Sequence, residues 1–114
     1  LVKLIREHFG DYFGICVAGY PEGHPQGSYE DDLKYLKQKV DAGADFVITQ
    51  LFYDVDQFLK FVNDAREMGI KVPILPGIMP IHNYDSWKRM TTFCKTNVPE
   101  HILEDLKQVN TDDD

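Results

Sequence analysis

A loop rich in glycine and proline carries the first side chains that could bind a ligand or transfer a proton. Residues 19–27 hold three glycines and two prolines, which excludes regular structure. Tyr20, Glu22 and His24 lie within this loop, and each can make directed hydrogen bonds. Structural explanations are also open, because His24 could bond the backbone and Tyr20 could fill the rim of a barrel. The loop is therefore a candidate binding site whose chemistry these residues leave undecided.

An apolar run holds the second candidate. Residues 46–53 read Phe-Val-Ile-Thr-Gln-Leu-Phe-Tyr, which is typical of a parallel strand buried on both faces. A buried amide costs about 2–7 kcal/mol unless it is hydrogen-bonded. Gln50 is therefore either satisfied by neighbouring backbone or directed from the strand end toward a ligand. By this argument Gln50 is the strongest functional candidate.

Two further groups of polar residues are weaker candidates for ligand binding. Residues 76–83, Pro-Gly-Ile-Met-Pro-Ile-His-Asn, form a second punctuated loop that offers His82 and Asn83. Asp32 lies in the first turn of a predicted helix, where the helix dipole alone explains an acidic residue. Lys39 lies near the end of that helix, where lysines are usually solvated. No nucleophile–base pair or metal-type cluster follows from the spacing.

Periodicity predicts the elements that position these residues. Helical stripes, capping residues and strand-like runs alternate along the chain. Pro73 and Pro76 predict that the last strand is short. The predicted order is a helix over 1–9, a strand over 12–18, a helix from Ser28 to Gly43, a strand over 46–53, a helix from Asp54 to Gly69, a strand over 72–78, and helices over 84–95 and 99–109.

The same patterns predict which side chains are buried. The first strand is expected to turn Phe13, Ile15 and Val17 to one face. The helical stripes face the core. They comprise Tyr29, Leu33, Leu36 and Val40 in the first long helix, Val55, Phe58, Leu59, Val62 and Ala65 in the next, and Trp87, Met90 and Phe93 in the third.

Strands that alternate with helices predict an α/β fold with parallel strands. Three parallel strands leave two open edges, whereas a closed eight-stranded barrel needs about 250 residues. We therefore expect a partial (β/α)8 TIM barrel of about three consecutive βα units. Residues 1–114 would be a single segment from its later-middle part and no complete domain. A small doubly wound sheet is the competing fold, but no G-x-G-x-x-G follows a predicted strand.

Composition narrows the class of partner. The formal net charge of -7 argues against nucleic-acid binding, which usually needs a basic face. No apolar run approaches the roughly 20 residues of a membrane span. Cys16 and Cys94 are the only cysteines and lack metal-type spacing. Two isolated thiols indicate a reducing compartment, so we expect a cytoplasmic protein that binds neither nucleic acid nor membrane.

Four ordered motifs resemble the methylenetetrahydrofolate reductase family. Together they extend over nearly the whole chain, and the Y-P-E-G-H-P form is similar to the eukaryotic branch. The motifs are V-A-G-Y-P-E-G-H-P at 17–25, D-L-x-x-L-K-Q-K-V-D-A-G-A-D at 32–45, I-T-Q-L-F-Y-D at 48–54 and P-G-I-M-P at 76–80.

The resemblance implies a (β/α)8 barrel that binds FAD. NAD(P)H reduces the flavin, and the flavin reduces 5,10-methylenetetrahydrofolate to 5-methyltetrahydrofolate. Four positions match FAD contacts of the family, and Gln50 matches the contact to folate or nicotinamide. The partners implied are the folate, the nicotinamide nucleotide and, for the complete protein, a homo-oligomer. The FAD positions are Tyr20, His24, Asp32 and Lys39.

The resemblance also marks what this stretch lacks. The family's catalytic acid and half of its flavin pocket would precede Leu1, so no catalytic residue is expected here and the segment alone is expected to be inactive. Ser86 and Met90 replace a glutamine and a phenylalanine that contact folate in bacterial members. The alternatives are a non-catalytic α/β segment with a vestigial ligand site and an unrelated phosphate-binding barrel.

Overall fold

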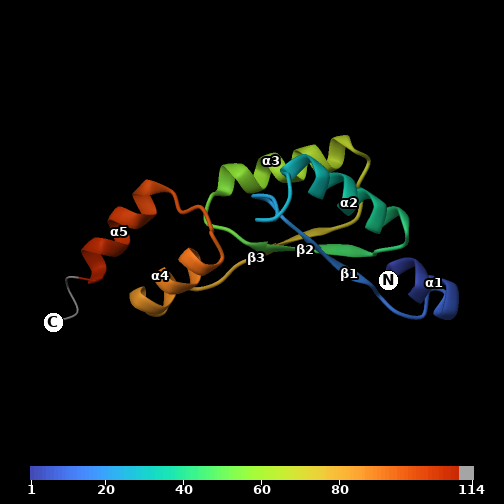
Figure 1. Ribbon diagram of the computed structural model, residues 1–114, viewed down its shortest axis with the longest axis horizontal. Coiled ribbons are helices and arrows are strands. Elements are labelled where there is room, and N and C mark those ends of the chain that lie inside the picture. The colour runs from blue at the N-terminus through green and yellow to red at the C-terminus, as the bar shows by residue number, and fades with distance from the viewer. Residues whose placement is uncertain (111–114) are drawn as a thin grey trace.

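Helices and strands alternate along residues 1–110, the part of the chain described by the computed structural model (Figure 1). The strands are parallel and lie in the order β1-β2-β3. The α/β class with three consecutive βα units is confirmed, as is the predicted order of elements. The elements are α1 (Val2–Phe9), β1 (Cys16–Gly19), α2 (Tyr29–Asp41), β2 (Phe46–Leu51), α3 (Val55–Glu67), β3 (Ile74–Gly77), α4 (Tyr84–Phe93) and α5 (Glu100–Asn110).

Side-chain caps explain where the long helices begin. Ser28, Asp54 and Asn83 each accept a hydrogen bond from the backbone N–H three residues further on. Such N-caps satisfy amides that the helix itself leaves unpaired. Gly43 and Gly69 directly follow the C-caps of α2 and α3, with φ of 119° and 88°. The predicted starts at Ser28 and Asp54 and the glycine stops are therefore confirmed.

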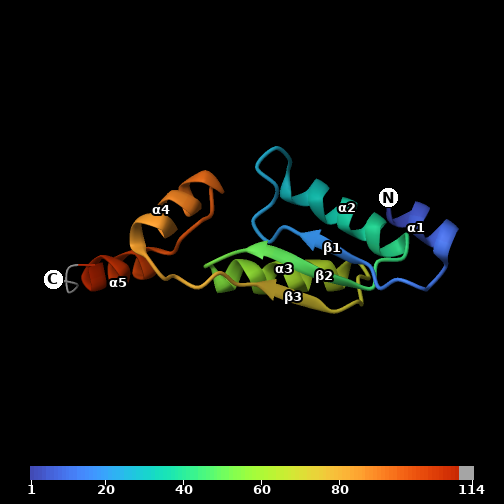
Figure 2. The ribbon, with the colours of Figure 1, turned by 90° about the horizontal axis from the view of Figure 1, so that it is seen from below.

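The core lies between the sheet and two helices on one of its faces. Figures 1 and 2 show α2 and α3 on the same side of the strands, and within residues 1–110 no helix covers the other side. Val47 and Phe61 are almost completely buried. The core comprises Ile15, Val17, Leu33, Leu36, Ala44, Val47, Phe61, Ala65 and Ile70.

The second strand is buried on one face, so the prediction of burial on both faces is wrong for this chain. Val47 and Thr49 point into the core, whereas Ile48 is 44% exposed. Leu75 of β3 is also exposed on this part of the sheet, at 47%. The physical reason is that successive residues of a strand point to opposite faces, and α2 and α3 supply a partner layer for only one of them. In a closed barrel the other face turns inward.

Two smaller predictions about side chains and one about a strand boundary are also wrong. Phe13 lies in a turn before β1 and is 45% exposed, because Arg6 donates hydrogen bonds to the carbonyls of Gly10 and Phe13 and holds the chain there. Phe93 is 88% exposed, since it ends α4 beyond the buried Trp87 and Thr91. The first strand, β1, begins at Cys16 rather than at residue 12.

The buried face of α3 is rotated from the predicted stripe. Phe61 and Ala65 are its buried residues, whereas Val55 and Leu59 are 59% and 52% exposed. Phe61 was absent from the predicted stripe, yet it is 1% exposed. Residues 61 and 65 are one helical turn apart, so their side chains define a face from which Val55 and Leu59 diverge.

An ion pair fixes the end of the sheet where the strands begin. Asp45 Oδ2 accepts hydrogen bonds from the Ile15 N–H and from Arg6, each at 2.7 Å. The Ile15 N–H bond, followed by the Arg6 guanidinium, lowers the pKa of the Asp45 carboxyl. Arg6 also donates to the Gly43 carbonyl at 2.7 Å. These contacts stabilise the amino ends of the strands and leave the carboxyl ends for binding.

The last two helices extend beyond the carboxyl ends of the strands (Figure 1). Tyr53 contacts Trp87 of α4 edge-on, with ring centroids 5.9 Å apart.

The expected segment runs to Asp114, and its last four residues lie outside the described part. Within residues 1–110, no helix combines the length and apolar character needed to cross a bilayer.

Candidate functional site

The loop after β1 holds two aromatic rings against each other. Tyr20 and His24 meet edge to face, with ring centroids 5.2 Å apart. The Gln26 N–H donates to His24 Nδ1 at 3.1 Å. In a neutral imidazole the proton then sits on Nε2, which is left as a donor. The backbone bond expected as the structural explanation for His24 is therefore present, and it also orients the ring.

Asp32 ties this loop to the start of α2. Its Oδ2 accepts a hydrogen bond from the backbone N–H of His24. The helix dipole explains an acid in this turn, but it does not explain this contact across the loop. Asp32 therefore positions the loop that carries Tyr20 and His24.

Gln50 lies near the carboxyl end of β2 on the uncovered face of the sheet. Its side chain is exposed, and within residues 1–110 no hydrogen bond engages the amide. Satisfaction by neighbouring backbone is therefore wrong, because the strand directs Gln50 away from the packed face. The ladder between β2 and β3 is irregular from Ile48 to Leu51. Thr49 Oγ1 accepts the Gly77 N–H at 2.9 Å within this irregularity.

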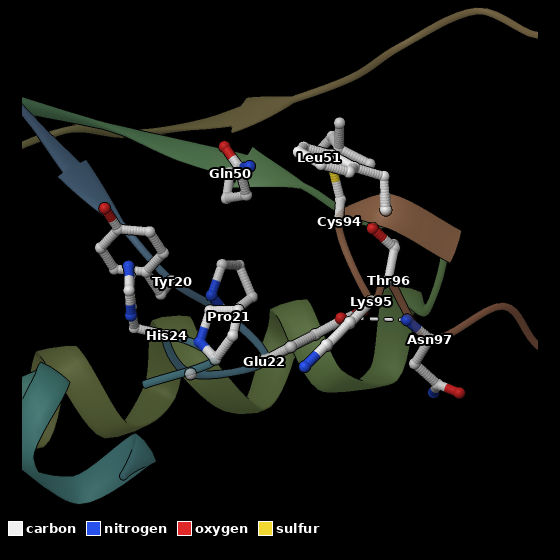
Figure 3. Close-up of a pocket in the computed structure, with 13 residues that line it drawn as sticks. Tyr20, Pro21, Glu22, His24, Gln50, Leu51, Cys94, Lys95, Thr96 and Asn97 are labelled. Carbon is white, nitrogen blue, oxygen red and sulfur yellow. Dashed lines mark hydrogen bonds between the residues drawn. The ribbon is translucent and has the colours of Figure 1, made fainter. Parts of the chain in front are cut away.

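A hollow of about 590 Å³ joins the loop after β1 to the end of β2. Figure 3 shows Tyr20 and His24 on one side, Gln50 on β2 above them, and the chain after α4 on the far side. The hollow thus brings together residues separated by up to 77 positions in sequence. Its lining comprises Tyr20, Pro21, Glu22, Gly23, His24, Pro25, Gln50, Leu51, Phe93, Cys94, Lys95, Thr96 and Asn97.

A second hollow, of about 510 Å³, adjoins the first through Tyr20. Asp32 and Lys39 of α2 line it together with Val17 and Ala18 of β1. The five residues predicted from the sequence therefore occupy two hollows that share one tyrosine. Tyr20, His24 and Gln50 line the first hollow, and Tyr20, Asp32 and Lys39 line the second.

The loop after β3 is separate from these hollows. Met79, His82 and Asn83 line a smaller hollow of about 210 Å³ together with Ser86 and Met90. Asn83 also caps α4. The structure therefore does not bring Met79, His82 or Asn83 into the hollow that Gln50 lines.

Sequence reasoning missed the connection between α4 and α5, residues 94–99. The Asn97 N–H donates to Glu22 Oε2 at 3.1 Å, so this connection reaches the loop after β1. The pKa of the Glu22 carboxyl is raised overall, chiefly by burial and also by the nearby Asp54 carboxylate. The hydrogen bond from Asn97 opposes this shift. The Asn-x-Pro sequence at residues 97–99 marks a turn, but nothing in it specifies the partner.

The fold and the hollows define a class: a segment of a parallel α/β barrel with hollows at the carboxyl ends of its strands, where such barrels bind their ligands. Within residues 1–110 no group of three or more His, Cys, Asp or Glu residues could hold a metal ion. The family model for methylenetetrahydrofolate reductase matches residues 1–114. The chain belongs to the methylenetetrahydrofolate reductase family.

Several curated relatives align with the whole chain. A probable methylenetetrahydrofolate reductase (NADH) of Oryza sativa is 56% identical over 124 residues, and a probable methylenetetrahydrofolate reductase (NADPH) of Caenorhabditis elegans is 56% identical over 115. Methylenetetrahydrofolate reductase 2 of Saccharomyces cerevisiae is 47% identical over 117 residues. The chain spans 17–21% of the length of these relatives. The resemblance to the eukaryotic family is confirmed.

A solved structure shares the fold. It is described as an uncharacterized protein from Clostridium thermocellum that binds two copies of 5-methyl-5,6,7,8-tetrahydrofolic acid. The TM-score is 0.67 at 21% identity, and the alignment covers 93% of this chain and 38% of that one. This similarity supports the barrel-type arrangement of the three βα units.

Proposed function

We propose that residues 1–114 form part of the catalytic barrel of an FAD-dependent methylenetetrahydrofolate reductase. The reaction is reduction of 5,10-methylenetetrahydrofolate to 5-methyltetrahydrofolate with NAD(P)H. One observation carries the proposal: Tyr20, His24 and Gln50 converge on one hollow at the carboxyl ends of the strands. The plant relative is named for NADH and the nematode relative for NADPH at equal identity, so the proposed donor is the class NAD(P)H.

The second hollow suits the polar part of FAD. A carboxylate at Asp32 can accept bonds from sugar hydroxyls, and an ammonium at Lys39 can pair with a phosphate. Val17 and Ala18 offer an apolar wall beside them. Tyr20 lies where this hollow meets the first one, so one extended ligand could contact both. When bound, FAD would supply the electron-transfer chemistry, and these residues would bind and orient it.

Gln50 suits the substrate side of the site. Its amide offers both a donor and an acceptor, as the amide-like edges of folate and nicotinamide require. The side chain is exposed at the strand end and free of internal hydrogen bonds within residues 1–110. A ligand would therefore gain its hydrogen bonds without displacing a partner from within this segment.

The segment is proposed to act only within a longer polypeptide. It spans about a fifth of its plant relatives, and by family resemblance the acid that protonates folate lies elsewhere. Residues 1–114 alone are therefore expected to show no reductase activity. Oxidation of NAD(P)H with menadione by the purified segment would contradict this.

His24→Ala in the complete polypeptide is expected to weaken FAD binding about tenfold, because it removes the ring that packs edge-on against Tyr20 and one N–H donor. The measurement is a flavin absorbance or fluorescence-quenching titration. His101→Ala is the matched control, since His101 is an exposed histidine on α5 that lines neither hollow. Equal FAD affinity in both variants would remove His24 from the site.

The complete reductase is further proposed to be a cytoplasmic homo-oligomer. Cys16 and Cys94 are both free thiols, as expected in a reducing compartment. Cell fractionation and gel filtration test these two statements. Recovery of the protein in a membrane or organelle fraction, or elution as a monomer, would contradict the corresponding one.

A further inference from the structure

A carboxylate joins two segments that border the first hollow. Glu22, on the loop after β1, accepts the Asn97 N–H at 3.1 Å across 75 residues of sequence. Figure 3 shows this bond below Gln50, with Cys94, Lys95 and Thr96 on the same stretch of chain as Asn97. The bond therefore holds one wall of the hollow against the other.

The contact belongs to a small network at the start of α3. The Asn97 side-chain amide donates to Asp54 Oδ2 at 3.3 Å, and Asp54 Oδ1 caps α3 by accepting the Gln57 N–H. Gln57 Nε2 donates to the Pro21 carbonyl at 2.7 Å. Three segments thus meet through directed bonds: the loop after β1, the first turn of α3 and the α4–α5 connection.

The other half of the Glu22 carboxyl is enclosed and unpaired. Within residues 1–110, Oε1 is buried without a hydrogen-bond partner. Burial raises the pKa of this carboxyl group, while Oε2 accepts from the Asn97 N–H. A glutamine at this position would present the same shape, with an acceptor toward Asn97 and a donor on the other side.

Lys95 shows that the connection is constrained. Its φ of 53° makes it the non-glycine residue with positive φ in the described part of the chain. This conformation costs about 1 kcal/mol for an ordinary side chain, so surrounding contacts must hold it. Asn97 follows Lys95 by two residues, and its N–H bond to Glu22 is such a contact.

We propose that Glu22 is a positioning residue that seats the α4–α5 connection over the ligand hollow. This inference rests on the proposed function, because the hollow is the proposed folate and flavin site. Glu22 touches no reacting atom in this account. It acts through Asn97, by placing Cys94, Lys95 and Thr96 opposite Gln50.

The test uses the complete polypeptide with Glu22→Ala, Glu22→Gln and the control Glu100→Ala, an exposed glutamate in the first turn of α5. The rate of Cys94 alkylation by N-ethylmaleimide is read by peptide mass spectrometry, and kcat and KM for methylenetetrahydrofolate are measured in parallel. Glu22→Ala is expected to raise both the Cys94 labelling rate and the folate KM about tenfold. Glu22→Gln and Glu100→Ala are expected to match the wild type.

Asn97→Ala provides a second variant in case Glu22→Ala does not fold. It keeps the backbone N–H to Glu22 and loses only the bond to Asp54, so a labelling increase of about twofold to threefold is expected.

Unchanged labelling or unchanged folate KM in Glu22→Ala, or equal effects of alanine and glutamine at position 22, would overturn the proposal. If Glu22→Ala does not fold, unchanged labelling in Asn97→Ala overturns it. A wild-type protein that neither binds FAD nor reduces folate would overturn the proposed function instead, and the Cys94 labelling pattern would still decide the role of Glu22.

Discussion

Gly77→Ala is expected to lower the free energy of unfolding by about 3 kcal/mol, at the upper end for an overpacked site. A Cβ at Gly77 would overlap the Thr49 carbonyl oxygen and lie 3.1 Å from the Thr49 carbonyl carbon. These are backbone atoms of the neighbouring strand, so a side-chain rotation cannot relieve the overlap. Urea unfolding of the complete polypeptide, followed by circular dichroism, measures the loss.

Gly14→Ala is the matched control. A Cβ there would meet only the Asp45 carboxylate, at 4.0 Å, which is ordinary contact. The control is expected to stay within about 0.5 kcal/mol of the wild type. Equal unfolding midpoints for the two variants would show that β3 does not approach β2 as closely as described. The clash also lies beside Gln50, so a folded Gly77→Ala protein is expected to lose folate turnover as well.

Gln50→Ala is expected to lower kcat/KM for methylenetetrahydrofolate by about 10- to 100-fold while FAD affinity stays unchanged. The reason is that Gln50 is exposed at the strand end and is proposed to contact the substrate, whereas the proposed FAD contacts are Tyr20 and His24 elsewhere on the first hollow and Asp32 and Lys39 in the second. Steady-state kinetics at saturating NAD(P)H measure the effect. Removal of an exposed side chain changes stability by about 0.5 kcal/mol or less, so folding does not confound the result.

Gln26→Ala is the control for this substitution. It removes an exposed amide from the loop after β1 and keeps the backbone N–H that bonds His24. Its turnover is expected to match the wild type. Folate kinetics that are equal in Gln50→Ala and Gln26→Ala would exclude Gln50 from substrate contact.

Local signals account for the part of the fold that the sequence predicted. Capping by Ser28 and Asp54 and the glycines after α2 and α3 are decided by residues close in the chain, so the elements and their order followed. Long-range packing decided the rest. Phe61 was missed because the rotation of α3 depends on the sheet beneath it. Phe13 was wrongly predicted to lie in the strand, because Arg6 donates a hydrogen bond to the Phe13 carbonyl and holds it before β1.

The candidate site divides in the same way. The type and position of Gln50 left two alternatives, an amide bonded to neighbouring backbone or one directed toward a ligand, and favoured the second because a polar group in an apolar strand needs a partner. The role of Asp32 in holding His24, and the contact of Asn97 with Glu22, required the folded loops. Residues 94–97 carry no sequence motif that indicates a binding site. Their position on the wall of the first hollow opposite Gln50 is therefore known only from the structure.

The measurement that tests the central claim most directly is a paired assay on the complete polypeptide: FAD affinity by flavin absorbance and folate reduction by steady-state kinetics. It compares wild type, His24→Ala and Gln50→Ala. We expect the wild type to bind FAD and to reduce methylenetetrahydrofolate. We expect His24→Ala chiefly to weaken FAD binding and Gln50→Ala chiefly to impair folate turnover. If both variants bind FAD and turn over folate as the wild type does, the assignment of this site is wrong.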